Sequence, residues 1–384
     1  MKVMLISPYH GGSHRAWAEG YQRHSGHEVR LLTMPARYWK WRMHGGAITL
    51  ARRFLAHSWQ PDVLMATDML DLTTFLALTR VRNAGIPTIL YCHENQLTYP
   101  TPRPGKDGPW RRQLGQRDQH YAFINYASAL AADQVWFNSH YHHDAFLAAL
   151  PDFLKHFPEA NELASVGTIH DKSRVLPVGI DLARLQPPAA PRSAAEPPLI
   201  LWNQRWEYDK NPADFFAALY GVVDAGIPFR LALCGENFRR RPAEFDEARS
   251  RLAPRIIHFG YAKSDDYRRL LWQADVTIST AHHEFFGISI LEAIYCHTFP
   301  LLPRRLSYPE LLPPTAHEAC LYDTQAQLVE KLTWALTHLD DVRGMAGENA
   351  GSAAHYDWRH VAPTYDAALL DLTQASSKTV PTIG

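Results

Sequence analysis

The amino-acid sequence predicts an α/β protein with two successive domains, each built on a mostly parallel sheet. Short apolar runs of strand length alternate with longer segments of helical period, which is the pattern of βαβ units. The stretch 186–198 interrupts this alternation, because its five prolines among small residues can form neither a helix nor a central strand. A length of 384 residues also favours two domains over one.

Predicted strands form one series before this interruption and a second series after it. The first series lies at 3–6, 29–32, 62–65, 88–91, 134–137 and 174–176, and the second at 199–202, 229–233, 256–259, 275–278, 299–302 and 319–322. We therefore expect a first Rossmann-like domain at 1–185, a linker at 186–198 and a second Rossmann-like domain at 199–355. A last amphipathic helix at 356–374 is expected to pack back on the first domain, and a flexible tail at 375–384 to follow it.

Composition narrows the class of protein. Thirty-nine basic and 39 acidic side chains cancel, so a polyanionic partner has to be met by a local patch. The four cysteines, Cys92, Cys234, Cys296 and Cys320, show no C-x-x-C spacing, which argues against a disulfide framework or a zinc site. No apolar run approaches transmembrane length, and the N-terminus has no signal-peptide pattern. The expectation is a cytoplasmic protein.

Two glycines follow the first predicted strand. Gly11 and Gly12 stand where that strand gives way to a helix, so the backbone there can approach a ligand closely, and the N–H groups of the helix can meet a phosphate. The motif is not G-x-G-x-x-G, and a plain turn is an equally good interpretation.

In the second half, Arg205 and Lys210 lie in a polar loop between a predicted strand and a predicted helix. Both side chains can neutralise a diphosphate, Arg205 through its planar fork and Lys210 as a point charge. A solvated polar loop is the alternative interpretation.

A more specific signal is the stretch AHHEFFGISILEA, in which Glu284 and Glu292 are separated by seven residues. A strand ends before Glu284, and a helix begins at Gly287, so the N–H groups of Gly287, Ile288 and Ser289 form a candidate anion site. Glu284 is a candidate for binding sugar hydroxyls and Glu292 for binding a ribose. A capped helix with two surface glutamates is the alternative.

Dense polarity also ends a strand of the first half, in the stretch YCHENQLTYP. A histidine and a glutamate, His93 and Glu94, emerge together with Asn95 at the carboxyl end of the strand, which suits proton handling or substrate orientation. A structural histidine is the alternative for His93.

The segment 37–42 interleaves three cations with three aromatic rings, and no acid occurs between Glu28 and Asp62. Because bases stack on aromatic rings while cations hold phosphates, Arg37, Trp39, Lys40, Trp41 and Arg42 are expected to form an exposed nucleic-acid-binding loop. A second basic cluster lies at 103–117. Exposed basic loops are common, so composition alone leaves a solvated loop open.

These motifs together resemble a known family. Two α/β domains, Gly-Gly after the first strand, Arg205 with Lys210, and the E-x7-E pair resemble retaining glycosyltransferases of family 4, which have the GT-B fold. The stretches PARYWKWR, HENQLTYP, ADQVWFNSHYHHDAF, HEFFGISILEAIYC and YPELLP resemble the tRNA-queuosine α-mannosyltransferase family over roughly residues 2–315.

The resemblance implies roles for the donor site. That family moves mannose from GDP-mannose to queuosine at the wobble position of tRNA-Asp with retention, in a cleft between its two domains. Arg205, Lys210 and the N–H groups at 287–289 would stabilise the diphosphate, with Gly11 and Gly12 closing on it. Glu284 would hold the sugar and Glu292 the ribose, while Gly260 and Tyr261 lie where relatives read the nucleobase. No metal or other cofactor is expected, because cations and helix N-termini can stabilise departing GDP.

The resemblance also implies an acceptor site and partners. His93 would lie beside the transferred sugar, and Glu94, Asn95, Tyr99 and the 37–42 segment would contact the anticodon region of a queuosine-containing tRNA. No stable membrane association is expected. Two alternatives stay open: the same donor chemistry with a lipid-linked or small-molecule acceptor, and a non-catalytic tRNA-binding protein. A glycosidase is disfavoured because no second acid is paired with Glu284.

Overall fold

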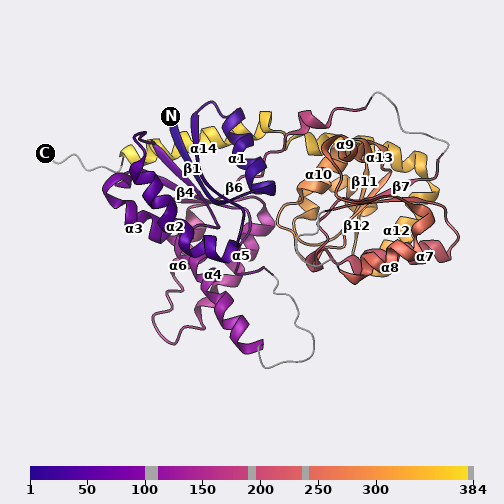
Figure 1. The fold of residues 1–384 in the computed structure, drawn as a ribbon, viewed down its shortest axis with the longest axis horizontal. Coiled ribbons are helices and arrows are strands. Elements are labelled where there is room, and N and C mark those ends of the chain that lie inside the picture. Colours follow the sequence, from indigo (N-terminus) through magenta and orange to yellow (C-terminus); the bar gives the residue numbers. More distant parts are fainter. Residues whose placement is uncertain (100–110, 189–195, 236–241, 379–384) are drawn as a thin grey trace. The chain divides into compact units, whose positions relative to one another are not determined.

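The computed structural model describes residues 1–99, 111–188, 196–235 and 242–378, with the side chains of 111–118 and 375–378 excluded. The chain forms two compact units (Figure 1). Unit 1 contains Met1–Ile180 and the segment from Trp358 onward, and unit 2 contains Asp181–Asp357. The predicted fold class of two α/β units with parallel sheets is confirmed.

Unit 1 has a six-stranded parallel sheet in the order β2-β1-β3-β4-β5-β6. Its strands are β1 (Lys2–His10), β2 (Glu28–Pro35), β3 (Val63–Thr67), β4 (Thr88–Cys92), β5 (Gln134–Phe137) and β6 (Ser173–Val175). Its helices are α1 (Gly12–His24), α2 (Trp39–Ala56), α3 (Leu72–Asn83), α4 (Arg111–Ala131), α5 (His140–Leu154), α6 (Ser165–Asp171) and α14 (Trp358–Lys378). Strands β3 and β4 are buried at every residue, which explains their uninterrupted apolar sequences.

Unit 2 has a second six-stranded parallel sheet in the order β12-β11-β10-β7-β8-β9. Its strands are β7 (Leu199–Trp202), β8 (Arg230–Cys234), β9 (Ile256–Gly260), β10 (Val276–Ile278), β11 (Phe299–Pro303) and β12 (Leu321–Tyr322). Its α-helices are α7 (Pro212–Asp224), α8 (Ala243–Arg251), α9 (Ser264–Gln273), α10 (Ile288–Tyr295), α11 (His317–Cys320), α12 (Gln325–Thr337) and α13 (Leu339–Ala354). Its 3₁₀ helices are η1 (Leu182–Leu185), η2 (Tyr208–Lys210), η3 (Ala253–Arg255), η4 (Tyr308–Leu311) and η5 (Pro314–Ala316).

The last helix, α14, packs on α1 within unit 1 (Figure 1). The Asp366 carboxylate accepts hydrogen bonds from the Tyr21 hydroxyl at 2.8 Å and from Ser25 Oγ at 2.6 Å. The indole of Trp358 lies against Gly20 and Gly179, where an added Cβ would come within 2.1 and 2.3 Å of it. The packing of this large indole against two glycines therefore fixes the start of α14.

The structure places the element boundaries differently from the sequence expectation at two points. Residues 181–185 belong to unit 2, because Leu182 and Leu185 are buried there and the Leu185 carbonyl accepts a 2.7 Å hydrogen bond from Trp272 Nε1. Helix α14 continues to Lys378, so the prediction of a loose tail from 375 is wrong for 375–378. Most of the expected linker, 189–195, and the end of the tail, 379–384, lie outside the described residues.

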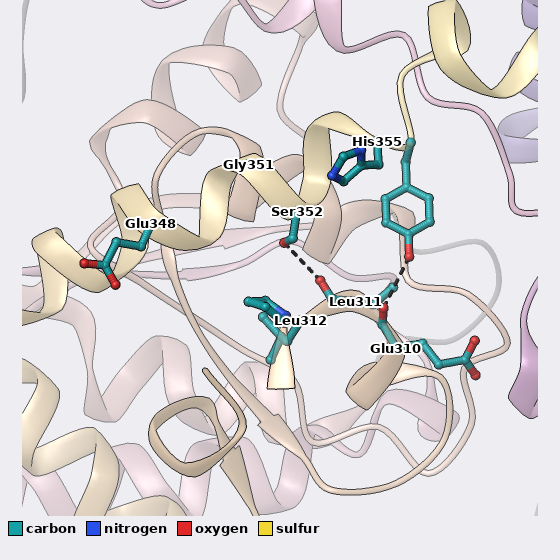
Figure 2. Close-up of a pocket in the computed structure, with 9 residues that line it drawn as sticks. Glu310, Leu311, Leu312, Glu348, Gly351, Ser352 and His355 are labelled. Atoms are coloured by element: carbon teal, nitrogen blue, oxygen red, sulfur yellow. Dashed lines mark hydrogen bonds between the residues drawn. The ribbon is translucent and has the colours of Figure 1, made fainter. Parts of the chain in front are cut away.

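A pocket of about 440 Å³ lies in unit 2 between η4 and the end of α13 (Figure 2). Ser352 Oγ donates to the Leu311 carbonyl at 3.3 Å, and the Tyr356 hydroxyl donates to the Glu310 carbonyl at 3.3 Å. These bonds fix the YPELLP segment against α13. None of the predicted site residues lines this pocket.

Candidate active site

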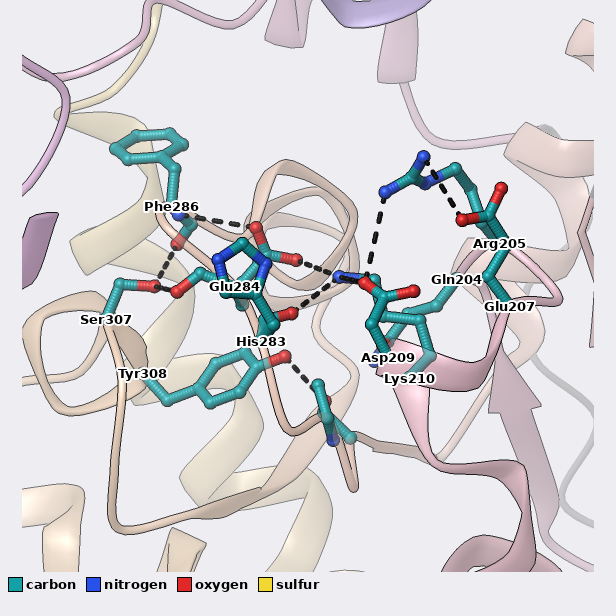
Figure 3. A network of polar contacts seen from close by, with 12 residues as sticks. Gln204, Arg205, Glu207, Asp209, Lys210, His283, Glu284, Phe286, Ser307 and Tyr308 are labelled. Atoms are coloured by element: carbon teal, nitrogen blue, oxygen red, sulfur yellow. Dashed lines mark hydrogen bonds and ion pairs between the residues drawn. The ribbon is translucent and has the colours of Figure 1, made fainter. Parts of the chain in front are cut away.

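The strand order of unit 2 identifies where a ligand binds. From the central strand β7 the chain runs outward through β8 and β9, then returns to the other side of β7 with β10. In open parallel sheets, ligands bind beyond the carboxyl ends of the strands at this reversal of order. The loops after β7 and β10 carry Arg205, Lys210 and Glu284, and Figure 3 shows their side chains converging.

Lys210 is the centre of this cluster. Lys210 is only 5% exposed. Its ammonium group lies 2.8 Å from the His283 carbonyl, 3.1 Å from Glu284 Oε2 and 3.2 Å from Asp209 Oδ2 (Figure 3). The 3₁₀ turn η2 and the left-handed Asn211, with a φ of 52°, bend the chain so that Lys210 points at the β10 loop. The structure therefore brings into contact Lys210 and Glu284, two residues that lie in separate motifs of the sequence.

Each charge in this pair holds the other ionised. Burial acts to lower the pKa of Lys210, yet Glu284 and Asp209 raise that pKa overall. Burial acts to raise the pKa of Glu284, but the Lys210 ammonium lowers that pKa overall. Burial and Lys210 lower the pKa of His283 to about 4, so its ring is neutral near pH 7. The cluster therefore has fixed charges at physiological pH.

Glu284 sits in a loop whose backbone is held from several sides. Its Oε1 accepts from the Phe286 N–H at 3.3 Å, and Ser307 Oγ donates to the Phe286 carbonyl at 3.0 Å. Gly287 follows with a φ of 105°, a conformation that favours glycine, and an added Cβ there would lie 2.9 Å from Leu311. Helix α10 then begins at Ile288 with no acidic residue in its first turn, so the N–H groups at 287–289 offer positive potential.

Arg205 lies at the exposed side of the cluster. Its side chain is 48% exposed, with loose ion pairs of 3.7 Å to Glu207 and 4.0 Å to Asp209 (Figure 3). Such pairs contribute little to stability. An exposed guanidinium next to a buried lysine is suited to binding an incoming anion.

Glu292 is buried in α10 and does not reach the solvent freely. Its carboxylate accepts from Arg184 through Oε1 and from the Tyr267 hydroxyl, at 2.8 Å, through Oε2. The sequence predicted the position of Glu292 in the helix but neither of these partners.

Gly260 and Tyr261 end the edge strand β9. Gly260 has a φ of 120°, and its carbonyl accepts from the Gly235 N–H at 3.1 Å. Tyr261 is 70% exposed. Both lie at the carboxyl edge of the sheet, but two strands from β7 and apart from the Lys210 cluster.

In unit 1 the polar loop after β4 is held by buried side chains that the sequence did not single out. The Asp68 carboxylate accepts from the His93 N–H at 2.9 Å, and the Asn138 amide donates to the His93 carbonyl at 2.9 Å. Asn125 bridges the two segments, since its amide donates to the Asp68 carbonyl at 2.9 Å and its oxygen accepts from the Gln96 N–H at 2.7 Å. These partners lie after β3, in α4 and after β5, where sequence pattern alone gives no sign of a shared site.

The charges in this loop are strongly perturbed. Burial, and then Glu94, raise the pKa of Asp68 well above its ordinary value. Burial, and then His14 and His142, lower the pKa of His93 well below its ordinary value, so its imidazole is neutral. The His93 ring lies 4.5 Å from both the His14 and Trp17 rings.

Three further predicted acceptor residues, Glu94, Asn95 and Tyr99, belong to this loop. Asn95 is buried, and its oxygen accepts from the Thr98 N–H at 2.8 Å, so it shapes the loop. Glu94 and Tyr99 are half-buried.

The glycine pair lies at the start of α1. Gly11 caps α1 in an extended conformation, and an added Cβ there would lie 2.5 Å from Ala36; Gly12 has a φ of 52°. The glycine pair is therefore fixed at the reversal of strand order between β1 and β3.

The predicted nucleic-acid segment is a helix start rather than a loop. Tyr38, left-handed with a φ of 52°, caps α2, and Trp39 to Arg42 form its first turn, because the Trp41 and Arg42 N–H groups bond to the Tyr38 carbonyl. Arg37 is exposed, and Arg42 Nε donates to the Pro35 carbonyl at 3.2 Å.

The aromatic residues of this turn play different parts. Trp39 packs on a buried cluster of Met43, Met69 and Ile124. Trp41 is 63% exposed, and its indole lies over Gly45, where an added Cβ would be 2.7 Å from the ring. Trp41 therefore offers a flat face supported by the helix. The second basic cluster falls on 100–110, outside the described residues, and on 111–118, whose side chains are also outside them.

Two features that the described residues lack bear on the site. Within them, no three His, Cys, Asp or Glu side chains are grouped so as to hold a metal ion. In the same part of the chain, no helix combines the length and apolar character needed to span a bilayer.

Comparison with known proteins identifies the family. A family model described as "tRNA-queuosine alpha-mannosyltransferase N-terminal" matches residues 2–180, and one described as "Glycosyl transferases group 1" matches residues 187–351. The tRNA-queuosine alpha-mannosyltransferase of Drosophila melanogaster is 33% identical over 341 residues, covering 86% of this chain and 85% of that protein.

The chain belongs to the tRNA-queuosine alpha-mannosyltransferase family. It is an enzyme, a glycosyltransferase with mannosyltransferase function, as the resemblance implied.

More distant relatives share parts of this description. The GDP-mannose:cellobiosyl-diphosphopolyprenol alpha-mannosyltransferase of Xanthomonas oryzae pv. oryzae is 22% identical, covering 64% of each chain. Sucrose-phosphate synthase from Thermosynechococcus elongatus superposes with a TM-score of 0.70 at 15% identity, covering 98% of this chain and 100% of that one. This structural likeness confirms the GT-B fold of this tRNA-queuosine alpha-mannosyltransferase family member.

Proposed function

We propose that this enzyme transfers mannose from GDP-mannose to the queuosine nucleoside at the wobble position of a tRNA of the tRNA-Asp type, with retention at the anomeric carbon. The match of unit 1 to the N-terminal family model carries the proposal, because that model is described by acceptor and sugar together. Relatives named for GDP-mannose support the choice of nucleotide.

The donor chemistry rests on the Lys210 cluster. As the bond between the anomeric carbon and the β-phosphate oxygen breaks, negative charge develops on the leaving GDP. Lys210, Arg205 and the N–H groups at 287–289 are suited to stabilising that charge. One preorganised contact of this kind contributes about 10²–10³ in rate.

The two glutamates then have different tasks. Glu284, held ionised by Lys210, accepts hydrogen bonds from the sugar hydroxyls, and Glu292 accepts them from the ribose. Front-face attack by the acceptor hydroxyl, with its proton passing to a β-phosphate oxygen, gives retention without a carboxylate nucleophile. Gly260 and Tyr261 would contact the nucleobase.

The acceptor side rests on the loop after β4 and on the first turn of α2. Neutral His93, with Glu94, Asn95 and Tyr99, would receive the queuosine ring. Arg37, Lys40 and Arg42 would hold phosphates of the anticodon region, and the exposed Trp41 face would stack on an unpaired base, while Trp39 supports the turn.

We also propose that transfer needs no metal and that the enzyme is cytoplasmic without stable membrane association. Lys210, Arg205 and the N–H groups at 287–289 would supply the positive charge that stabilises the leaving diphosphate. The four cysteines are free and buried, which fits a reducing compartment.

The test incubates the enzyme with labelled GDP-mannose, and separately with labelled UDP-glucose, and with tRNA from queuosine-replete or queuosine-free cells. The proposal predicts label only with GDP-mannose and replete tRNA, and no loss of label in EDTA. Equal label in both tRNA pools would contradict the acceptor, and label from UDP-glucose alone would contradict the donor.

A lipid-linked acceptor is a second candidate, because two of the GDP-mannose relatives are named for polyprenol or phosphatidylinositol acceptors. Flotation with anionic liposomes separates the candidates. The tRNA proposal predicts that the enzyme stays with the tRNA fraction and out of the floating fraction.

A further inference from the structure

The Glu292 carboxylate is nearly enclosed by its own protein. Its side chain is 5% exposed, although it lies on the helix that follows the Glu284 loop. One oxygen accepts from the Arg184 guanidinium and the other from the Tyr267 hydroxyl at 2.8 Å. Each carboxylate oxygen can accept a second hydrogen bond. The bonds to Arg184 and Tyr267 fix the directions from which a ligand can donate those second bonds.

Tyr267 is itself fixed. Burial, and then Glu292, raise the pKa of the Tyr267 hydroxyl, so it stays protonated and donates. The Asn203 amide contacts the Tyr267 hydroxyl at 3.3 Å and donates to the Ser289 carbonyl at 2.7 Å. The end of β7 and the first turn of α10 are thereby tied to the same carboxylate.

Arg184 approaches Glu292 from a different element. Its 3₁₀ helix η1 is anchored by buried Leu182 and Leu185 and by the bond from Trp272 to the Leu185 carbonyl. The Arg184 side chain remains 50% exposed, so one edge of the guanidinium meets Glu292 while much of the group faces solvent. The charge of Glu292 raises the pKa of Arg184.

A stability role explains this pair poorly, because a buried carboxylate facing one arginine is costly to desolvate and a well-packed apolar pair is often as stable. The pair lies at the carboxyl end of the sheet of unit 2, where the nucleotide is proposed to bind. A role in ligand binding therefore explains the pair better than stability does. Arg184 contacts one oxygen of the Glu292 carboxylate and Tyr267 the other, so the two partners together fix the plane of the carboxylate.

We propose that Arg184 is a positioning residue for nucleotide binding, which aims the Glu292 carboxylate at the ribose hydroxyls. The inference rests on the proposed function, in which Glu292 binds the ribose. Arg184 acts through Glu292, so its effect depends on whether the ligand carries those hydroxyls.

The test compares the affinities of the full-length protein for GDP and for 2′,3′-dideoxy-GDP by calorimetry. Wild type is expected to prefer GDP. In Arg184→Met the affinity for GDP falls about tenfold or more while that for the dideoxy nucleotide changes less than about twofold, since a hydrogen bond to a charged group is lost only with the first ligand. Arg184→Lys recovers most of the preference, and the KM for GDP-mannose changes more than kcat.

A matched control is Arg343→Met. Arg343 pairs at 3.0 Å with the buried Asp275, which lies at the opposite, amino end of the same sheet. This variant should lose stability without changing the preference for GDP.

The outcomes are distinguishable. If wild type prefers GDP and Arg184→Met weakens both nucleotides equally, or neither, the positioning role is wrong and the proposed function stands. If wild type binds GDP without preferring it over the dideoxy nucleotide, the ribose role of Glu292 fails and the inference with it. If wild type binds neither GDP nor GDP-mannose, the proposed donor is wrong.

Discussion

Lys210 Nζ and Glu284 Oε2 lie 3.1 Å apart, although the two residues are 74 positions apart in the sequence. The contact joins the loop after β7 to the loop after β10, across the reversal of strand order in unit 2. The pair thus places one buried cation and one carboxylate, the proposed sugar-binding group, at the same point of the sheet.

The first prediction concerns Lys210. Lys210→Met should lower kcat about 100-fold or more, because the leaving diphosphate loses a preorganised cation. The same change should cost about 3–5 kcal/mol of unfolding free energy, because the buried Asp209 and the half-buried Glu284 lose their cation. Steady-state kinetics and urea unfolding measure the two effects.

Lys172 supplies the control, since its half-buried ammonium donates to the Leu130 and Ala132 carbonyls in unit 1. Lys172→Met should lower stability and leave kcat within about twofold. A Lys210→Met enzyme with wild-type kcat would remove the proposed leaving-group role.

The second prediction is a pH dependence from Glu284. Its pKa is lowered in the folded protein, so the charged form stabilises the fold above the unfolded pKa, and this contribution disappears as the pH falls through the folded pKa. The stability difference between wild type and Glu284→Gln should therefore be largest near neutral pH and shrink between about pH 5 and about pH 3. Glu207→Gln, which alters a more exposed partner of Arg205, should show a smaller change. A difference that is constant over this pH range would contradict the ion pair.

The third prediction concerns Asp68. The pKa of Asp68 is raised in the folded protein. As the pH rises above the pKa of this carboxyl in the unfolded chain, the folded protein must either keep the proton or bury a charge, and both cost stability. Asp68→Asn keeps the acceptor for the His93 N–H without this cost, so its stability relative to wild type should rise between about pH 4 and about pH 7. Asp68→Ala should instead lose about 1–3 kcal/mol, because the His93 N–H loses its partner. Thermal unfolding at both pH values decides between these results.

The fourth prediction concerns the exposed face of Trp41. Trp41→Ala should weaken tRNA binding by about 1–3 kcal/mol, the value of one base–aromatic stack, and Trp41→Phe should recover part of it. Lys40→Ala and Arg42→Ala should weaken binding more at low salt than at high salt. Filter binding across a salt series measures both.

Arg52→Ala is the matched control for these variants, because Arg52 is an exposed cation later in the same helix. If Arg52→Ala weakens tRNA binding as much as Arg42→Ala does, the first turn of α2 has no special role.

The fifth prediction tests the packing of α14 on α1. Gly20→Ala places a Cβ 2.1 Å from Trp358 Nε1, so it should cost about 1–3 kcal/mol by overpacking. Trp358→Ala should cost about 3–5 kcal/mol by leaving a cavity. The variant with both Gly20→Ala and Trp358→Ala should lose less stability than the sum of the two single losses. The space left by the missing indole accommodates the added methyl group. Additive losses would show that the two residues do not share a contact.

Much of the fold could be predicted because buried parallel strands have short, mainly apolar sequences that can be recognised. The runs around Val63 and Thr88 are fully buried strands at the positions predicted from the sequence. The start of α2 was less predictable: Tyr38 adopts a left-handed φ that a sequence pattern does not reveal. Helix α14 also outlasts its apolar stripe.

The candidate site was predictable where residues follow a strand. Lys210 and Glu284 do so, and the carboxyl ends of β7 and β10 meet. Arg184 could not be found in this way, because it lies 108 positions from Glu292 on a 3₁₀ turn. Asp68 and Asn125 were likewise missed, since their contacts depend on how β3, β4 and α4 pack together.

The central claim is tested most directly by the product on tRNA. Wild-type enzyme and Glu284→Ala are incubated with GDP-mannose and with tRNA from queuosine-replete or queuosine-free cells, and the nucleosides are digested and analysed by mass spectrometry. The account predicts queuosine bearing one hexose only with wild-type enzyme and replete tRNA. Unmodified queuosine after incubation with active, GDP-mannose-binding wild type, or hexose on another nucleoside in both pools, would contradict it.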